Sequence, residues 1–150
     1  MTSEKEIEVT RLLNAPRELV FEVWTSEKHV DKWWGPNGFT NTTHKMDVRP
    51  GGEWLFVMHG PGGGSYDNRV RFVEVVKPEK LVYFHDSGKD NDPAEFHATI
   101  TFESVGKQTK VTLKSVFKTK EARDLAVREY GALEGAKQHL NKLESYLSGL

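Results

Sequence analysis

The chain has 150 residues, a length typical of one domain, and 37% of its residues are hydrophobic while 29% are charged. This composition excludes a disordered chain and a membrane-embedded protein, and the formal net charge of -1 provides no basic excess that would favour nucleic acid or an anionic lipid surface. The absence of cysteine excludes disulfide bonds and thiolate chemistry. We therefore expect one domain over residues 1–150. Residues 1–6 are polar with no apolar run behind them, which predicts a cytoplasmic protein without a signal peptide.

The N-terminal part of the chain has the pattern of a strand followed by two short helices. A loose alternation over residues 7–13 predicts the strand, and Pro16, a residue type favoured in the first turn of a helix, marks its end. Apolar residues at helical spacing over residues 19–24 predict the first helix. The second helix carries Trp33 and Trp34. Because these two are adjacent, we expect one of them in the core and the other at a cavity rim or in solvent.

Alternation with a period of two comes next and predicts six further strands. The expected strands contain residues 44–48, 54–58, 70–76, 81–85, 96–102 and 111–117. The glycine-rich run at residues 60–64 lacks the Lys-Ser/Thr ending of a phosphate-binding loop and stands between two expected strands. We therefore interpret it as a hairpin connection.

The last stretch, residues 119–150, has the pattern of a long amphipathic helix, which Gly131 can divide because glycine costs about 1 kcal/mol in a helix relative to alanine. Its apolar stripe consists of Leu133, Ala136, Leu140, Leu143, Leu147 and Leu150. An antiparallel meander of this size curls as it twists. The sequence thus predicts an α+β fold: a curved seven-stranded antiparallel sheet wrapped around a long C-terminal helix, with two short helices after the first strand. A pocket between sheet and helix is expected.

Few residue patterns indicate catalysis or metal binding. The six histidines form no metal-ligand set with each other or with acidic residues, so we expect no metal and no cofactor. No Gly-x-Ser-x-Gly motif is present, and no catalytic residue is assigned. Ser115 interrupts the apolar alternation of its strand, where its hydroxyl either faces a cavity or is satisfied in the core. The same two alternatives, cavity or structural role, hold for His44 and His85.

Several motifs resemble those of a known family. These are Ala15-Pro16 with Val20-Phe21 and Trp24, Trp33-Trp34-Gly35-Pro36, Arg49-Pro50-Gly51-Gly52, and the stretches 78–82 and 108–113. Together they resemble the activator of heat-shock protein 90 ATPase homologue-like family, within the START-like (SRPBCC, Bet v-like) helix-grip superfamily. The resemblance implies a hydrophobic cavity between sheet and helix. It also implies that a lipid-like or polyketide-like ligand, cyclase chemistry, stimulation of a chaperone and a role in stress response are possible functions.

One position departs from the family pattern. Members often carry Gly-Trp near the start of the last helix, whereas this chain has Gly135-Ala136. A methyl group cannot fill the volume of an indole, so we expect an enlarged cavity at this end of the helix.

The sequence and the resemblance together predict a set of ligand-binding residues. These are Trp34, Phe39, His44, Met46, Trp54, Phe56, Phe72, Phe84, His85, Phe96, Ser115, Gly135, Ala136, His139, Leu140 and Leu143. Our first hypothesis is a protein, monomeric or homodimeric, that binds a small apolar molecule without covalent chemistry. The alternatives are a cyclase or hydrolase acting in the same cavity, and a module that binds a chaperone. No nucleic-acid or membrane partner is expected.

Overall fold

The computed structural model describes residues 4–150, with the side chains of all of these except residues 129 and 130. One seven-stranded antiparallel sheet has the strand order β1-β7-β6-β5-β4-β3-β2. The strands are β1 (Glu6–Leu13), β2 (Thr40–Met46), β3 (Glu53–His59), β4 (Ser65–Val76), β5 (Lys80–Asp86), β6 (Phe96–Val105) and β7 (Gln108–Phe117). Consecutive hairpins join β2 to β7, and β1 adds to the far edge by pairing with β7. The predicted fold class is confirmed.

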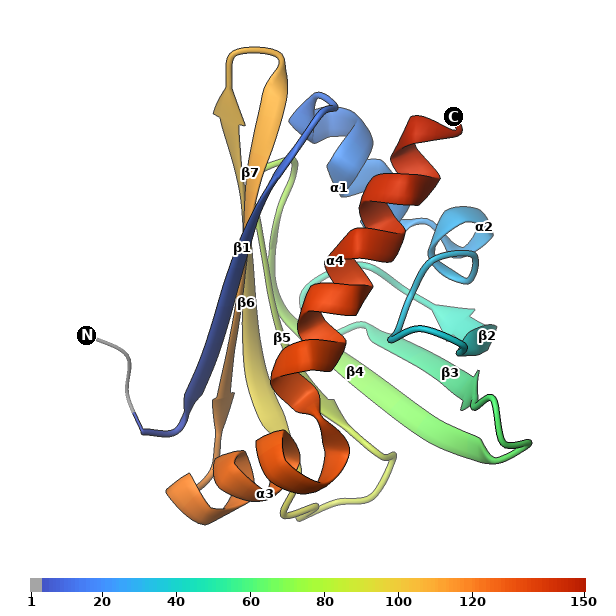
Figure 1. Cartoon of the computed structure of the whole chain (residues 1–150), viewed down its shortest axis with the longest axis vertical. Coiled ribbons are helices and arrows are strands. Elements are labelled where there is room, and N and C mark those ends of the chain that lie inside the picture. Colours follow the sequence, from blue (N-terminus) through green and yellow to red (C-terminus); the bar gives the residue numbers. More distant parts are fainter. Residues whose placement is uncertain (1–3) are drawn as a thin grey trace.

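Four helices accompany the sheet in the described part of the chain. They are α1 (Arg17–Thr25), α2 (Glu27–Val30), α3 (Lys120–Tyr130) and α4 (Ala132–Ser148). Figure 1 shows that the sheet curves around α4, with β1, β6 and β7 on one side of the helix and β2, β3 and β4 on the other. The short helices α1 and α2 lie beside the C-terminal half of α4.

The expected break at Gly131 separates α3 from α4. Gly131 has φ 59° and ψ 37°, a left-handed conformation that favours glycine. Its N–H donates to the carbonyl of Ala126, which closes α3. Thr119 caps the other end of α3, because its hydroxyl accepts from the N–H of Ala122 at 3.0 Å. The chain therefore changes direction at Gly131, and α4 crosses the concave face of the sheet (Figure 1).

The predicted apolar stripe of α4 packs on the core over most of its length. Leu140 and Leu143 are only 1% and 0% exposed, and Leu133 and Leu147 pack partly buried against the same core. Leu150 was expected to continue the stripe, but it is 60% exposed. The reason is that α4 ends at Ser148, so Leu150 no longer follows the helical spacing.

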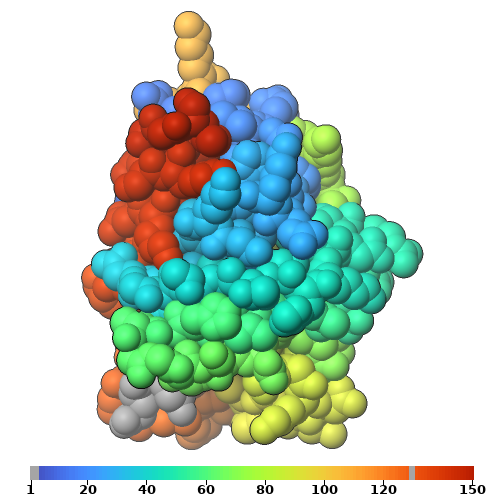
Figure 2. Space-filling model, turned by 90° about the vertical axis from the view of Figure 1, so that its right-hand side faces the viewer, coloured from blue at the N-terminus to red at the C-terminus, as the bar shows by residue number. Residues whose placement is uncertain are grey.

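Residues 34–39, here called the 34–39 segment, connect α2 to β2 and are fixed to α4 by polar contacts. The amide of Asn37 donates to Gln138 Oε1 at 3.0 Å. Lys142 Nζ donates to the carbonyl oxygens of residues 34, 36 and 39 at 3.3, 3.3 and 3.2 Å. Figure 2 shows this segment, in cyan, crossing the surface between α4 and the β3–β4 hairpin, in green. The segment therefore covers this side of the space between helix and sheet.

The packing of α4 gives a first prediction. Leu140→Ala should lower the free energy of unfolding by about 2–5 kcal/mol, because it leaves a void in a close-packed core. Urea denaturation measures this change. Lys137→Ala, at an exposed position on the same helix, is the control and should change the free energy by less than about 0.5 kcal/mol. An equal effect of the two substitutions would show that the stripe does not face the core.

Candidate functional site

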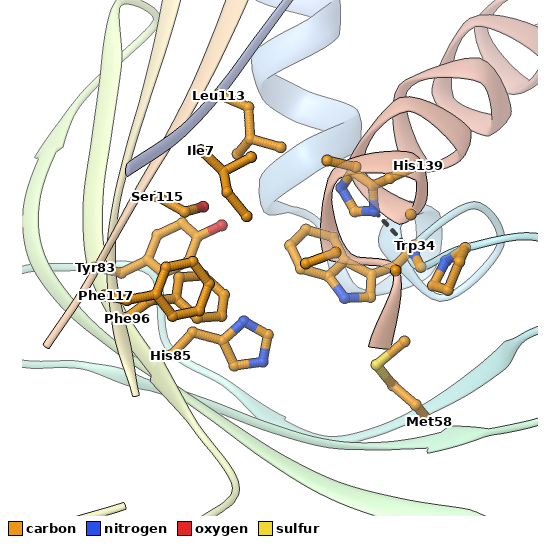
Figure 3. A pocket seen from close by; sticks show the side chains of 16 residues that line it. Ile7, Trp34, Met58, Tyr83, His85, Phe96, Leu113, Ser115, Phe117 and His139 are labelled. Atoms are coloured by element: carbon orange, nitrogen blue, oxygen red, sulfur yellow. Dashed lines mark hydrogen bonds between the residues drawn. The ribbon is translucent and has the colours of Figure 1, made fainter. Parts of the chain in front are cut away.

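A cavity of about 230 Å³ lies between the inner face of the sheet and the first turns of α4. Figure 3 shows the side chains around it. They come from β1, β3, β5, β6 and β7, from α4, and from the 34–39 segment. Residues from both halves of the chain therefore form this site, and only the folded protein brings them together.

One row of residues across the sheet forms the centre of the cavity floor. The strand register pairs Tyr83 with Ala98 and Ala98 with Ser115. On the next strand, Ile7 pairs with Ser115. Ala98 is fully buried and has only a methyl group, so it leaves space between the side chains of Tyr83 and Ser115. The centre of the floor thus has a hydroxyl-bearing residue on either side of a small one.

A second row, two residues further along the strands, forms the aromatic part of the floor. His85 pairs with Phe96, and Phe96 pairs with Phe117. The ring centroids of His85 and Phe96 are 4.9 Å apart, and those of Phe96 and Phe117 are 5.3 Å apart. Neighbouring aromatic rings at such distances stabilise one another. This part of the cavity therefore offers flat and mostly apolar surfaces.

The helical wall consists largely of small residues. Gly131, Gly135 and His139 recur at intervals of four, and Ala132 and Ala136 do so one residue later, so all five share one face and line the cavity. A Cβ atom added to Gly135 would meet no neighbouring atom closer than 3.8 Å. The small side chains at the start of α4 therefore leave space that larger ones would fill.

The two adjacent tryptophans have different roles. Trp33 is 1% exposed, and its Nε1–H donates to the carbonyl of Val23 at 3.0 Å, which fixes it in the core. Trp34 lines the cavity. Its ring centroid lies 4.3 Å from that of His139 and 4.7 Å from that of Trp54, both in edge-to-face geometry. Trp34 is thus the one that forms a cavity wall.

His139 is neutral, and its tautomer follows from one hydrogen bond. The backbone N–H of Gly35 donates to His139 Nδ1 at 2.9 Å, so the ring proton must be on Nε2. Burial lowers the pKa of His139 to about 3, and the positive charge of Lys142 acts in the same direction. In Figure 3 the Nε2 edge lies on the cavity side of the ring. His139 therefore presents a neutral N–H donor to the cavity.

His85 presents the opposite polarity. Asn68 Nδ2 donates to the carbonyl of Tyr66 at 3.0 Å, which turns Asn68 Oδ1 toward His85 Nε2 at 2.8 Å. Nε2 must then carry the proton, and Nδ1 keeps a lone pair. Burial lowers the pKa of His85 to about 4, although the carboxylates of Asp86 and Asp92 oppose this. His85 is thus a neutral acceptor beside the cavity.

Two hydroxyl groups complete the polar part of the site. Figure 3 shows that the hydroxyls of Tyr83 and Ser115 are both on the sheet side of the cavity, at its floor. Burial raises the pKa of Tyr83, and the indole of Trp24, which can only donate, moderates this rise. The phenol therefore stays protonated and keeps its own O–H to donate. Among the described residues, no side-chain hydrogen bond to Ser115 is present.

The cavity contains part of the predicted residue set. The predicted residues that line it are Trp34, His85, Phe96, Ser115, Gly135, Ala136 and His139. A second group belongs to the core cluster behind the cavity: Trp54, Phe56, Phe72, Leu140 and Leu143. Met46 pairs with Trp54 at the edge of this core. Phe39 lies against Tyr66, with ring centroids 6.3 Å apart, outside the cavity lining.

Two predicted residues face away from the cavity, and the structure corrects their assignment. Phe84 lies between Tyr83 and His85, so alternation turns it to the outer face, where the guanidinium of Arg71 lies 5.5 Å from its ring centroid. His44 is exposed because a β-bulge between Thr43 and Lys45 inserts one extra residue in β2. That bulge reverses the direction that simple alternation assigned to His44.

Sequence reasoning missed other lining residues. These are Ile7, Gly35, Pro36, Met58, Tyr83, Leu113, Phe117, Gly131 and Ala132. The sequence could have indicated some of them, because residues an even number of positions apart on a strand share one face. Tyr83 shares its face with His85, and Leu113 and Phe117 share theirs with Ser115. Gly131 and Ala132 stand one helical turn before Gly135 and Ala136.

Among the described side chains, those of residues 4–128 and 131–150, no group of three or more histidine, aspartate or glutamate residues could hold a metal ion. Within the same residues, no helix has both the length and the apolar composition needed to cross a membrane.

Solved structures with the same fold are numerous. Protein NE0264 from Nitrosomonas europaea is 25% identical with a TM-score of 0.86, and the match covers 99% of this chain and 97% of that chain. A protein from Arthrobacter aurescens is 21% identical with a TM-score of 0.89, covering 98% and 88%. Protein Ms6760 from Mycobacterium smegmatis is 23% identical with a TM-score of 0.85, covering 96% and 91%. None of the curated proteins compared matches this chain.

The sequence itself matches one protein family over nearly its whole length. Residues 14–148 match the family described as Activator of Hsp90 ATPase homolog 1-like protein. The matched range includes the tryptophan pair, all strands except β1, and the helix that closes the cavity. The chain therefore belongs to the Activator of Hsp90 ATPase homolog 1-like family.

Proposed function

We propose that this protein reversibly binds a small apolar molecule in the cavity between α4 and the sheet, without covalent chemistry. The observation that carries the proposal is the cavity itself, about 230 Å³ in volume and lined mainly by rings and small side chains. Protein interiors are close-packed and contain few voids larger than a water molecule. The fold of this family commonly binds hydrophobic ligands, which supports a ligand as the reason for the space.

The volume favours a compact ligand. An engineered apolar cavity of about 150 Å³ accepts benzene. A cavity of about 230 Å³ is therefore suited to one ring with substituents, or two small fused rings, more than to a long acyl chain or a large polyketide. Among lipid-like and polyketide-like molecules, we propose that the ligand is one of the smallest.

The protonation states of the cavity residues favour binding over catalysis. A general base or acid works best when its pKa is near the working pH. His85 and His139 have pKa values lowered to about 4 and about 3, and the pKa of Tyr83 is raised, so none of them exchanges protons readily near neutrality. Chaperone binding, a role in stress response and a cytoplasmic location stay predictions from the resemblance and the composition.

The proposal predicts binding of a plain aromatic probe. Fluorobenzene should bind, because burying its apolar surface is worth roughly 25 cal/mol per Å², and ¹⁹F NMR titration measures its Kd. Ala136→Trp should weaken binding at least about tenfold, since an indole on this face of α4 occupies the cavity. Lys137→Trp adds the same ring at an exposed position of the same helix and should bind as the wild type does.

Circular dichroism and thermal melts verify that both variants are folded. If wild type and folded Ala136→Trp bound fluorobenzene equally, the start of α4 would not border the binding site. If wild type bound neither fluorobenzene nor any of the substituted probes described below, the proposed function would be wrong.

The two cavity histidines, His85 and His139, predict a specific pH dependence of stability. Their folded pKa values of about 4 and about 3 lie below the unfolded value of about 6.5. Below pH 6.5 the unfolded chain binds protons that the folded chain does not. The free energy of unfolding should therefore fall as the pH drops from about 6.5 to 4, by up to about 1.4 kcal/mol per pH unit for each histidine.

Urea denaturation at a series of pH values between 7 and 5 measures this slope. His85→Gln removes one of the two titrating groups, while its amide can still donate to Asn68. The slope of this variant should be smaller than that of the wild type, and identical slopes would contradict the assignment of His85 as a neutral group with a lowered pKa.

A further inference from the structure

We propose that the cavity selects an uncharged ring compound that carries a hydroxyl group, such as a phenol, over a hydrocarbon of the same size and over an ion. This inference deepens the proposed function and rests on it. It is carried by the arrangement of four polar groups, on Tyr83, His85, Ser115 and His139, around a space that is otherwise apolar (Figure 3).

The four groups have complementary hydrogen-bonding capacities. His85 Nδ1 can only accept, because the ring proton is on Nε2, which donates it to Asn68 Oδ1. His139 Nε2–H can only donate, because Nδ1 accepts from Gly35. Tyr83 has an O–H to donate, and Ser115 can do both. A ligand hydroxyl can donate and accept at once, whereas an ether or ketone oxygen can only accept and would leave His85 Nδ1 without a partner.

These groups are also close enough in the fold to act on one ligand. Tyr83 and His85 are two residues apart on the same face of β5, which places them roughly 7 Å apart along the strand. Ser115 lies in the same row as Tyr83, with only the methyl of Ala98 between them. His139 faces them from α4 across the cavity (Figure 3). A ring between floor and helix is therefore within reach of polar groups on both sides.

The charge state of the walls explains the discrimination against ions. None of the described lining residues is an aspartate, glutamate, lysine or arginine. The lining histidines are neutral, since burial lowers the pKa of His85 to about 4 and that of His139 to about 3. A carboxylate or ammonium group would lose its hydration on entry and find no opposite charge, which is strongly unfavourable. A neutral hydroxyl loses much less hydration and regains it as hydrogen bonds.

The flat walls explain the preference for a ring. Trp34 stands at one side of the cavity, and Phe96 and Phe117 form the floor beside His85. Aromatic side chains provide large apolar surfaces that suit offset-stacked or edge-to-face contacts with another ring. The volume of about 230 Å³ leaves room for one substituted ring.

Four fluorinated probes test the inference by ¹⁹F NMR titration at pH 7: fluorobenzene, 4-fluorophenol, 4-fluoroanisole and 4-fluorobenzoate. We expect 4-fluorophenol to bind at least about tenfold more tightly than fluorobenzene. The anisole, which cannot donate, should bind no better than fluorobenzene, and the benzoate should not bind measurably. Equal affinities for fluorobenzene and 4-fluorophenol would overturn the inference while leaving the proposed function intact. Tight binding of the benzoate would overturn it as well.

Variants assign the effect to the named groups. Ser115→Ala and His85→Phe should each reduce the preference for 4-fluorophenol over fluorobenzene by at least about threefold, while fluorobenzene itself still binds. Tyr66→Phe removes a hydroxyl from a tyrosine that is 55% exposed and should keep the wild-type preference. Ser115→Ala is nearly isosteric, so it carries the test if His85→Phe does not fold. An unchanged preference in Ser115→Ala would contradict the role of its hydroxyl.

Discussion

The cavity depends on the hydrogen bonds that hold α4 against the 34–39 segment. The first turns of α4 have glycine and alanine where a helix normally carries large apolar side chains, so apolar packing alone cannot fix them. Lys142 instead donates to three backbone carbonyl oxygens, one for each of its N–H bonds, and burial lowers the pKa of this amine. Gln138 and His139 bind backbone amides of the same segment. Because these contacts are polar and directional, the helix is held in place without filling the space beneath it.

This arrangement divides α4 into two functional parts. The C-terminal part anchors the helix through Leu140 and Leu143, which are almost completely buried. The N-terminal part, through Gly135 and Ala136, borders the cavity. His139 stands where the two parts meet, and it serves both, because Nδ1 accepts from the backbone while Nε2 faces the cavity side.

Much of the fold was predictable from the sequence, because periodicity is informative where one face of an element is buried. The alternation of β6 and the stripe of α4 gave both elements correctly, and the left-handed conformation of Gly131 explains the break in the last helix. The floor was harder to predict. Residues 81–84 of β5 are all apolar or aromatic, so no polar residues mark which face of the strand points outward. For this reason Phe84 was assigned to the cavity and Tyr83 was missed. The bulge that turns His44 outward has no signal in the residue pattern. Trp54 and Phe56 look the same in sequence whether they form a wall or the core behind it.

The small residues at the start of α4 also bear on how the family can diversify. A larger side chain at Gly135 or Ala136 reduces the volume of the cavity but does not alter Leu140, Leu143 or the strand register. The volume of the cavity is therefore adjustable by single substitutions at two adjacent positions of α4, separately from the residues that keep the chain folded. A scaffold with this separation can acquire new ligands through mutation without first becoming unstable, which is a condition for evolvability.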